Sequence, residues 1–262
     1  MIAILQWTTL VVCGLVAVAR IPSAIRGENR SLFFTYALMT VGILLSIDAP
    51  YLAVDRVLGG ENVTNLLLRF IIFGIIFALG LRIARGFGAD GALRLITGLP
   101  GVAFAGLASV AVVVVFLMMD TTGSSAGLIG VYYKDATNAA LVEYYGAAGR
   151  LYPAFICLAL LPATVRMARS ALPGLVRLGA ALLAVGTSTL ALSVLSPVIP
   201  ESLGYLRYVL NYSAVLSLVA GLAAIWLSKT RAAKAPAERQ TAASPSVPQR
   251  YVRQPPGHSQ NH

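Results

Sequence analysis

Seven apolar stretches of roughly 20 residues constrain the fold of this chain more than any other feature. Each is long enough to cross the ~30 Å hydrocarbon core of a bilayer as an α-helix. Only 11% of the residues are charged, whereas about a quarter are charged in a typical globular domain. The sequence therefore predicts an all-α membrane protein, a bundle of seven transmembrane helices. The stretches are Met1–Ala19, Leu32–Val54, Thr64–Leu81, Leu95–Met119, Asn138–Ala163, Leu175–Ser196 and Leu206–Leu227.

The basic residues alternate between the gaps that separate these stretches. Fifteen of the 20 Lys and Arg residues lie in every second gap or in the C-terminal tail. Such an excess is typical of cytoplasmic loops, so we expect an N-terminus outside and a C-terminus in the cytoplasm, in a bacterial plasma membrane. The first stretch is expected to be a retained helix and not a cleaved signal peptide. The basic residues are Arg20, Arg26, Arg30, Arg82, Arg85, Arg94, Arg166, Arg169, Arg177, Lys229, Arg231, Lys234, Arg239, Arg250 and Arg253.

Two regions follow from the composition. Residues 1–228 form the transmembrane domain, and residues 229–262 form a disordered, basic cytoplasmic tail that is rich in Ala, Pro, Ser and Gln. The net charge of +10 is dispersed over short loops beside the apolar stretches. This pattern predicts contact with the lipid bilayer and its anionic headgroups, and no binding of nucleic acid.

Several familiar motifs fail on their context. Gly86–Gly91 matches the Gly-x-Gly-x-x-Gly dinucleotide pattern, but it lies in a short loop between two predicted membrane helices, where no strand precedes it. The two histidines lie in the tail, and the three lysines lie outside the apolar stretches, which excludes a retinal Schiff base. We therefore expect no enzyme activity, no cofactor and no metal site.

Four ionisable side chains lie within the apolar stretches: Asp48, Arg69, Glu143 and Arg150. Each costs of order 2.5–3.5 kcal/mol on membrane insertion scales, so each is a candidate functional residue. Asp48 and Arg69 are expected to pair between consecutive helices, and Glu143 and Arg150 share one helical face. Asn211 in the seventh stretch adds a polar group.

Two interpretations of this set stay open. In the first, Asp48, Arg69, Glu143, Arg150 and Asn211 line an outward-facing pocket for a small polar or anionic ligand. In the second, they form interhelical ion pairs that only hold the bundle together. Pro50 and Pro153 are predicted to kink their helices next to these groups, which frees backbone carbonyls.

Smaller features complete the sequence picture. Asn62-Val63-Thr64 matches a glycosylation sequon on the predicted outer side. The Ala- and Arg-rich composition suggests a bacterial protein, so this match is weak evidence for glycosylation. The external segment Asp120–Thr137 is expected to contain a short re-entrant or interfacial piece near Tyr132 and Tyr133. Small residues predict close helix packing. They are Gly74, Ala78, Gly146, Gly149, Gly179, Gly186, Ala220 and Ala224.

Three segments carry a resemblance to a known family. They are Gly27–Arg30 leading to Asp48-Ala49-Pro50, Tyr132–Asp135 before the fifth stretch, and Leu175–Ala180 at the start of the sixth. Over roughly residues 20–227 the chain resembles an uncharacterised actinobacterial family of seven-span proteins labelled as predicted transporters. The resemblance implies a seven-helix membrane fold and transport, and it assigns no residue a role.

Two classes of function remain. The first is a transporter or small-molecule-handling protein with an outward-facing polar pocket. The second is a receptor-like or accessory module that relays an outer-side signal to a membrane or cytosolic protein partner.

Overall fold

The computed structural model describes residues 2–27 and 30–198, together with Leu206, Leu210, Ser213, Ala214 and residues 216–228 of a last helix. These residues form helices and turns, and no strand is found among them. The long helices are α1 (Ile2–Ile25), α2 (Arg30–Leu45), α4 (Val63–Gly86), α6 (Leu99–Met118), α8 (Ala136–Ala168) and α9 (Gly174–Leu192). The short ones are α3 (Asp48–Val57), α5 (Asp90–Thr97), η1 (Ala126–Leu128), α7 (Ile129–Tyr132) and η2 (Ser193–Val198).

The all-helical membrane fold is confirmed. Four helices are long and apolar enough to cross a bilayer, or five if the bent pair α2 and α3 counts as one span. Trp7–Pro22 and Leu216–Ser228 are two further apolar helical segments, shorter than a full span. By length and composition the chain is a multi-pass membrane protein.

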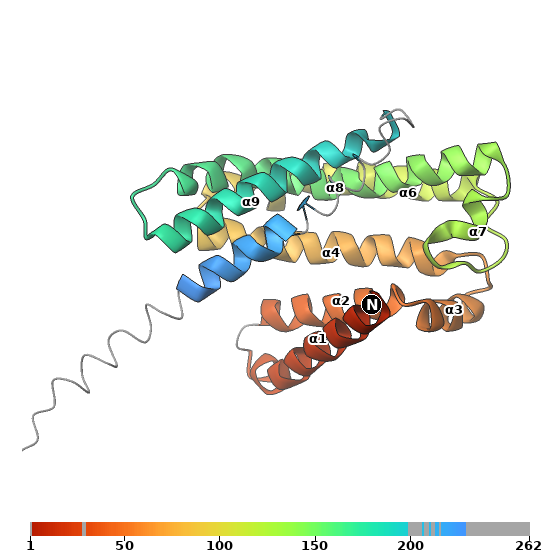
Figure 1. Cartoon of the computed structure of the whole chain (residues 1–262), viewed down its shortest axis with the longest axis horizontal. Helices are drawn as coiled ribbons and strands as arrows, with labels where there is room; N and C mark the ends of the chain where they lie inside the picture. Colours follow the sequence, from red (N-terminus) through yellow and green to blue (C-terminus); the bar gives the residue numbers. More distant parts are fainter. Residues whose placement is uncertain are drawn as a thin grey trace, which may run out of the picture.

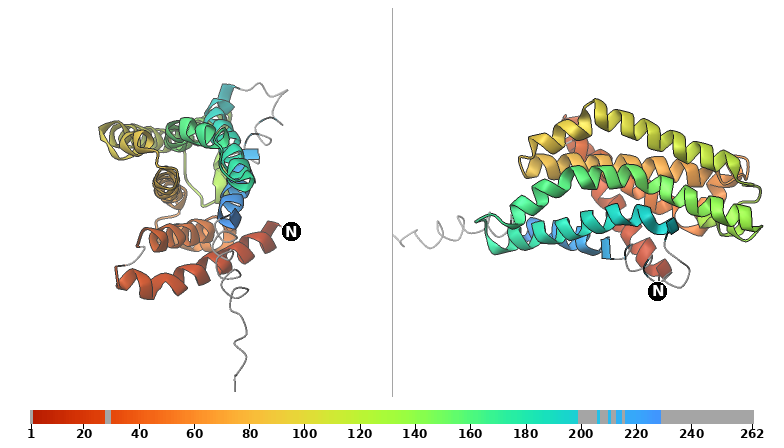
Figure 2. Two further views of the ribbon diagram at one scale, coloured as in Figure 1. Left: turned by 90° about the vertical axis from the view of Figure 1, so that its left-hand side faces the viewer. Right: turned by 90° about the horizontal axis from the view of Figure 1, so that it is seen from above.

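The surface of the bundle agrees with a lipid environment. The outer face of α6 exposes Val102, Leu107, Val110 and Leu117, each by more than half. Its opposite face buries Ala108, Val112 and Phe116 in the core. A helix that is apolar on all sides belongs inside a membrane or a large core, and α6 lies at the edge of the molecule (Figure 2). Lipid is therefore the natural neighbour of its outer face.

The helix α8 is the centre of the bundle. It packs against α4, α5, α6, α7 and α9, while α1 packs on α2 and α2 on α4. Seen end-on, the α1–α2 pair lies on one side of α4, and α6, α8 and α9 lie on the other (Figure 2). The core around α8 is aromatic, with Phe73 and Tyr152 ring centroids 5.3 Å apart and Phe104 stacked on Phe155 at 4.7 Å.

The bundle has two distinct ends (Figure 1). We call the α7 end the one that holds α3, α7 and the starts of α4 and α8. We call the α5 end the one that holds α5, the ends of α4 and α8, and the start of α9. The predicted basic gaps after the third and fifth stretches lie at the α5 end.

The second predicted stretch, Leu32–Val54, is not one straight span. Helix α2 ends at Leu45, and α3 starts at Asp48 at an angle of 91° to it. Pro50 lies in the first turn of α3, a position where its missing N–H costs no helical hydrogen bond. The expected kink is thus a complete break, which carries Asp48 out of the apolar helix.

The fourth stretch starts later than predicted. Leu95 and Ile96 belong to the amphipathic helix α5, and α6 begins at Leu99. The turn between α5 and α6 is tight enough that a Cβ on Gly101 would overlap the Ile96 carbonyl. In contrast, α8 continues through Pro153 and Pro162 as one helix of 33 residues.

Close packing at small residues is found at several of the predicted positions. Gly74 lies against Leu38 of α2, and Gly179 and Gly186 of α9 lie against the last helix. A Cβ on Gly179 would be 2.8 Å from the Gly221 carbonyl oxygen. On the last helix, Gly221 makes this close approach, whereas the predicted Ala220 is exposed.

Candidate functional site

Glu143 and Arg150 lie on one face of α8, two turns apart as the sequence predicts. Both side chains are half-buried, and both take part in interactions within the molecule. The Nη1 of Arg150 lies 3.7 Å from the position that a Cβ on Gly146 would occupy, so the guanidinium folds back along its own helix. Since α8 starts at Ala136, Arg150 is about 20 Å along the helix from the α7 end.

Arg69 of α4 lies against the adjoining face of α8. Its guanidinium carbon is 5.0 Å from the centroid of the Tyr145 ring, a cation–π contact. The same side chain covers Gly149, where a Cβ would be 2.9 Å from Cδ and 3.0 Å from Nη1. Gly149 therefore leaves the space that Arg69 fills.

The hydroxyl of Tyr145 is the unusual atom in this region. Tyr145 is fully buried, and its hydroxyl has no hydrogen-bond partner among the described residues. A buried hydroxyl without a partner costs roughly 1–3 kcal/mol. Beside it lies Arg69, whose planar fork of donors suits carboxylate and phosphate groups. Arg69 of α4 thus lies against the turns of α8 that carry Tyr145 and Arg150.

The predicted pairing of Asp48 with Arg69 is wrong. Asp48 is exposed in the first turn of α3, and within the described part of the chain Arg69 makes no ion pair with it. The physical reason is the 91° turn after Leu45, which moves Asp48 away from the path of α2. Of the five predicted site residues, Glu143 and Arg150 share a face of α8, and Arg69 lies against Tyr145 and Gly149 of the same helix. Asn211 lies outside the described residues.

A second polar cluster, which the sequence did not single out, closes the α7 end. We call it the outer network: Tyr51, Asp55, Asn62, Thr64 and Ser124. The fully buried Asp55 carboxylate accepts hydrogen bonds from the Asn62 and Thr64 backbone N–H groups, both at 3.0 Å, and from Ser124 Oγ at 2.6 Å. These contacts satisfy free N–H groups at the start of α4, as an N-terminal cap does.

Asn62 joins three segments in the outer network. Its Oδ1 accepts from the Tyr51 hydroxyl and the Ser125 N–H, both at 2.9 Å. Its Nδ2 donates to the carbonyls of Thr121 at 2.8 Å and Gly123 at 2.9 Å. Its backbone is left-handed, with φ of 56°, a conformation that Asn tolerates better than most residues. The sequon asparagine is thus fully buried and fully engaged inside the protein.

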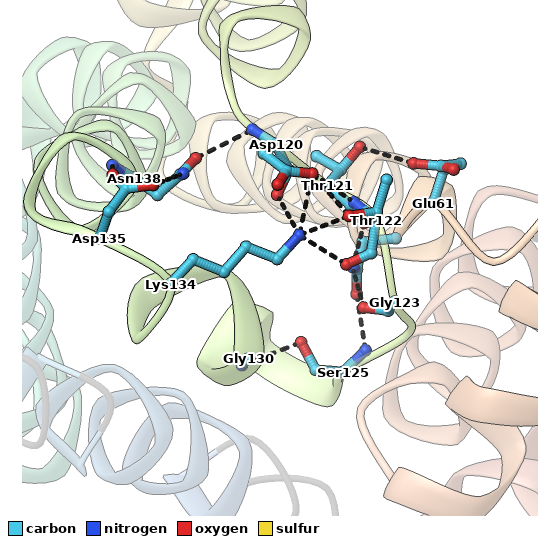
Figure 3. Close-up of polar contacts among 11 residues, drawn as sticks. Glu61, Asp120, Thr121, Thr122, Gly123, Ser125, Gly130, Lys134, Asp135 and Asn138 are labelled. Carbon is cyan, nitrogen blue, oxygen red and sulfur yellow. Dashed lines mark hydrogen bonds and ion pairs between the residues drawn. The ribbon is translucent and has the colours of Figure 1, made fainter.

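The loop before α8 is held by Lys134, as Figure 3 shows. Its Nζ donates to the Asp120 carbonyl at 3.0 Å and to the Thr122 carbonyl at 2.7 Å, and it pairs with Asp120 Oδ1 at 2.9 Å. Hydrogen bonds from the Thr122 hydroxyl and from Lys134 lower the pKa of Asp120 to about 2. The predicted short piece in this segment is α7, with Tyr133 exposed beside it.

Helix α8 starts from the same loop. The Asp135 carboxylate accepts from the Asn138 N–H at 2.7 Å and caps the helix, and this bond is the main cause that lowers the pKa of Asp135. Asn138 Oδ1 in turn accepts from the Asp120 N–H at 2.9 Å (Figure 3). The starts of α4 and α8 are therefore connected through the same loop, since Asn62 and Asn138 both bond to it. This connection fixes how far Arg69 and Glu143 lie from the α7 end.

One sequence signal could have revealed the outer network. Asp55 follows the second apolar stretch directly, and Gly59-Gly60 marks a tight turn before the polar Asn62 and the next helix. N-terminal capping is indicated when an acidic residue and a two-glycine turn precede an Asn at the start of a helix. Both glycines have positive φ, as such a turn requires.

Other candidate chemistry is sparse. Gly86–Gly91 runs from the last residue of α4 through a short turn into the start of α5, and a helix precedes it, which confirms its interpretation as a turn. In the described part of the chain no three His, Cys, Asp or Glu side chains come together as a metal site would need. Cys13 and Cys157 are buried free thiols.

The comparisons with known proteins identify no relative. No protein-family model, no curated protein and no solved structure matches this chain.

Proposed function

We propose that this chain is a seven-helix protein of the bacterial plasma membrane, with its N-terminus outside and its C-terminus in the cytoplasm. The alternation of Lys and Arg supports this orientation, because the α5 end of the bundle holds the basic gaps around Arg82, Arg94 and Arg169. The α7 end then faces outward. Reporter fusions after Arg85 and after Arg169 test it: a reporter that is active only in the cytoplasm must work at both positions.

We propose that the protein binds and transports a small anionic or polar molecule at Arg69, Tyr145 and Arg150. The observation that carries this proposal is the buried Tyr145, whose ring lies under the Arg69 guanidinium and whose hydroxyl has no hydrogen-bond partner in the described residues. A carboxylate or phosphate oxygen there would accept from Tyr145 and Arg69 together. Glu143 is the one acid on this part of α8, so the region keeps an excess of positive charge.

The resemblance to predicted transporters supports the same proposal. So does the continuous course of α8, which carries Arg150 about midway between the two ends. Freed backbone and charged groups at this depth are tolerated where they line a polar cavity.

The experiment is uptake into proteoliposomes of labelled succinate, glutamate and inorganic phosphate. Wild-type protein is expected to accumulate at least one of these anions, and Arg69→Gln and Arg150→Gln are expected to lose at least about tenfold of the rate. Arg177→Gln, an exposed arginine at the α5 end, is the matched control and keeps its rate. Equal uptake by all four proteins would contradict the proposed site.

A receptor-like or accessory role is the second candidate. The outer network favours it, because it joins α3, α4 and the loop before α8 into one unit at the outward end. A signal received there could pass along α8 to a protein partner. Absence of uptake, combined with a stoichiometric partner on gentle purification, would favour this role over transport.

A further inference from the structure

A cavity of about 750 Å³ opens at the α5 end, far from Arg69 and Arg150. Its walls come from the α4–α5 turn, from α5, from the start of α6 and from the last part of α8. The volume falls in the range of ordinary ligand sites, about 300–1,000 Å³.

The polar part of this cavity holds two arginines from different helices, Arg94 of α5 and Arg166 of α8. Asp90 lines the same space. In the described part of the chain neither guanidinium makes an ion pair or a hydrogen bond, although Asp90 precedes Arg94 by one turn of α5. Two arginines and one aspartate leave a net charge of +1 on the lining, and both guanidinium forks are available to a ligand.

The rest of the lining is largely apolar. It includes Leu95, Pro100, Ala159 and Ala163, and the small alanines leave room along α8. The cavity therefore presents two cationic side chains together with an apolar surface. A molecule that fits both parts has one phosphate and a hydrocarbon chain.

We propose that this cavity binds the headgroup and upper acyl chain of one anionic phospholipid. A phosphodiester carries a single negative charge, which matches the net charge of +1, whereas a free phosphate monoester carries nearly two. Basic pockets between membrane helices on the cytoplasmic side are typical sites for anionic headgroups. The proposed topology puts the α5 end at that side, but binding in detergent does not depend on orientation.

The test uses the full chain in a neutral detergent, and native mass spectrometry counts the lipids it retains. Phosphatidylglycerol is expected to be kept as one molecule per chain, at least about tenfold more tightly than phosphatidylcholine, whose choline cation opposes the two arginines. The Arg94→Gln/Arg166→Gln double variant is expected to lose this preference. The control variant Arg85→Gln/Arg169→Gln removes the same charge from exposed positions outside the cavity. This control is expected to keep the preference for phosphatidylglycerol.

A second variant tests the apolar wall independently. Ala163→Trp fills the cavity from α8 and leaves both arginines in place, so it is expected to release the lipid as well. Retention of phosphatidylglycerol by the Arg94/Arg166 variant at the level of its control overturns the proposal. Displacement of the lipid by glycerol 3-phosphate at equal concentration also overturns it, because the site would then hold a soluble phosphate.

Discussion

The guanidinium carbon of Arg69 lies 5.0 Å from the centroid of the Tyr145 ring, which brings a charge of α4 onto the face of α8. Gly149 makes this contact possible, since Arg69 occupies the space where a side chain would be. The pair places a permanent cation beside a buried hydroxyl within the apolar part of the protein.

The first prediction concerns Gly149. Gly149→Val would force Arg69 off the Tyr145 ring, because even a Cβ comes within 2.9 Å of the Arg69 side chain. We expect a loss of about 1–3 kcal/mol in the free energy of unfolding, the usual cost of overpacking. Thermal unfolding in detergent measures it. Gly146→Ala is the control, as its Cβ has an ordinary contact of 3.7 Å; a larger loss for this variant would contradict the assignment.

The second prediction concerns Asp55. Asp55→Asn replaces a buried acceptor of three hydrogen bonds with an amide that turns a donor toward other donors. We expect a loss of about 2–3 kcal/mol, since bonds to a charged acceptor are worth about 1.5–3 kcal/mol each and some are kept. Asp48→Asn, exposed in the same helix, should change stability by less than about 0.5 kcal/mol. Chemical denaturation of both variants measures the free energy of unfolding. Equal losses of stability in the two variants would contradict a stabilising role of the outer network.

The third prediction concerns acid. The folded pKa of Asp120 is about 2, below its ordinary value of 3.8, so its contribution to the order of the loop is complete above that ordinary value. The contribution is lost as the pH falls from 3.8 toward 2. Hydrogen exchange of the Asp120–Asp135 loop should stay constant from neutral pH to about pH 5 and accelerate in that acid window, after correction for the intrinsic rate. In Asp120→Asn the loop should exchange faster at neutral pH, and the acid step should shrink.

The fourth prediction concerns the contact between α9 and the last helix. Gly221→Leu puts a side chain where Leu183 and the Gly179 carbonyl already lie, each within 3.0 Å of a Cβ. We expect the two helices to separate, with a loss of folded yield and a lower Tm. Gly106→Leu is the matched control, because a Cβ there meets open space on α6. A cysteine pair introduced across the contact between α9 and the last helix should cross-link in the Gly106→Leu protein and not in the Gly221→Leu protein.

The helical nature of the chain and its membrane environment could be predicted because both depend on local composition. A run of about 20 apolar residues must satisfy its own backbone, whatever its neighbours are. The boundaries were harder. The predicted stretch 95–119 crossed the turn at Gly98, because Leu95 and Ile96 are apolar in α5 as they would be in a span.

The candidate site was predictable only within one helix. Glu143 and Arg150 share a face of α8 because seven residues make two turns, a property of the helix alone. The partner of Arg69 depended on the path of another segment. Because consecutive helices are usually neighbours, the sequence favoured Asp48 as the partner of Arg69. The break at Ser46-Ile47 turns α3 away, and Arg69 instead lies against α8.

By itself, the sequence determined that this chain crosses a membrane several times as helices and which of its charges stand out, since hydrophobic length and periodicity are one-dimensional properties. Only the tertiary structure decided that Arg69 lies on Tyr145, that Asp55 and Asn62 close the α7 end, and that Arg94 and Arg166 share a cavity. Each of these contacts joins segments distant in sequence or separated by a turn. Their geometry depends on how whole helices pack. The local capping pattern before α4 points to Asp55 and Asn62, but it does not predict their partners Ser124 and Ser125 in a distant loop.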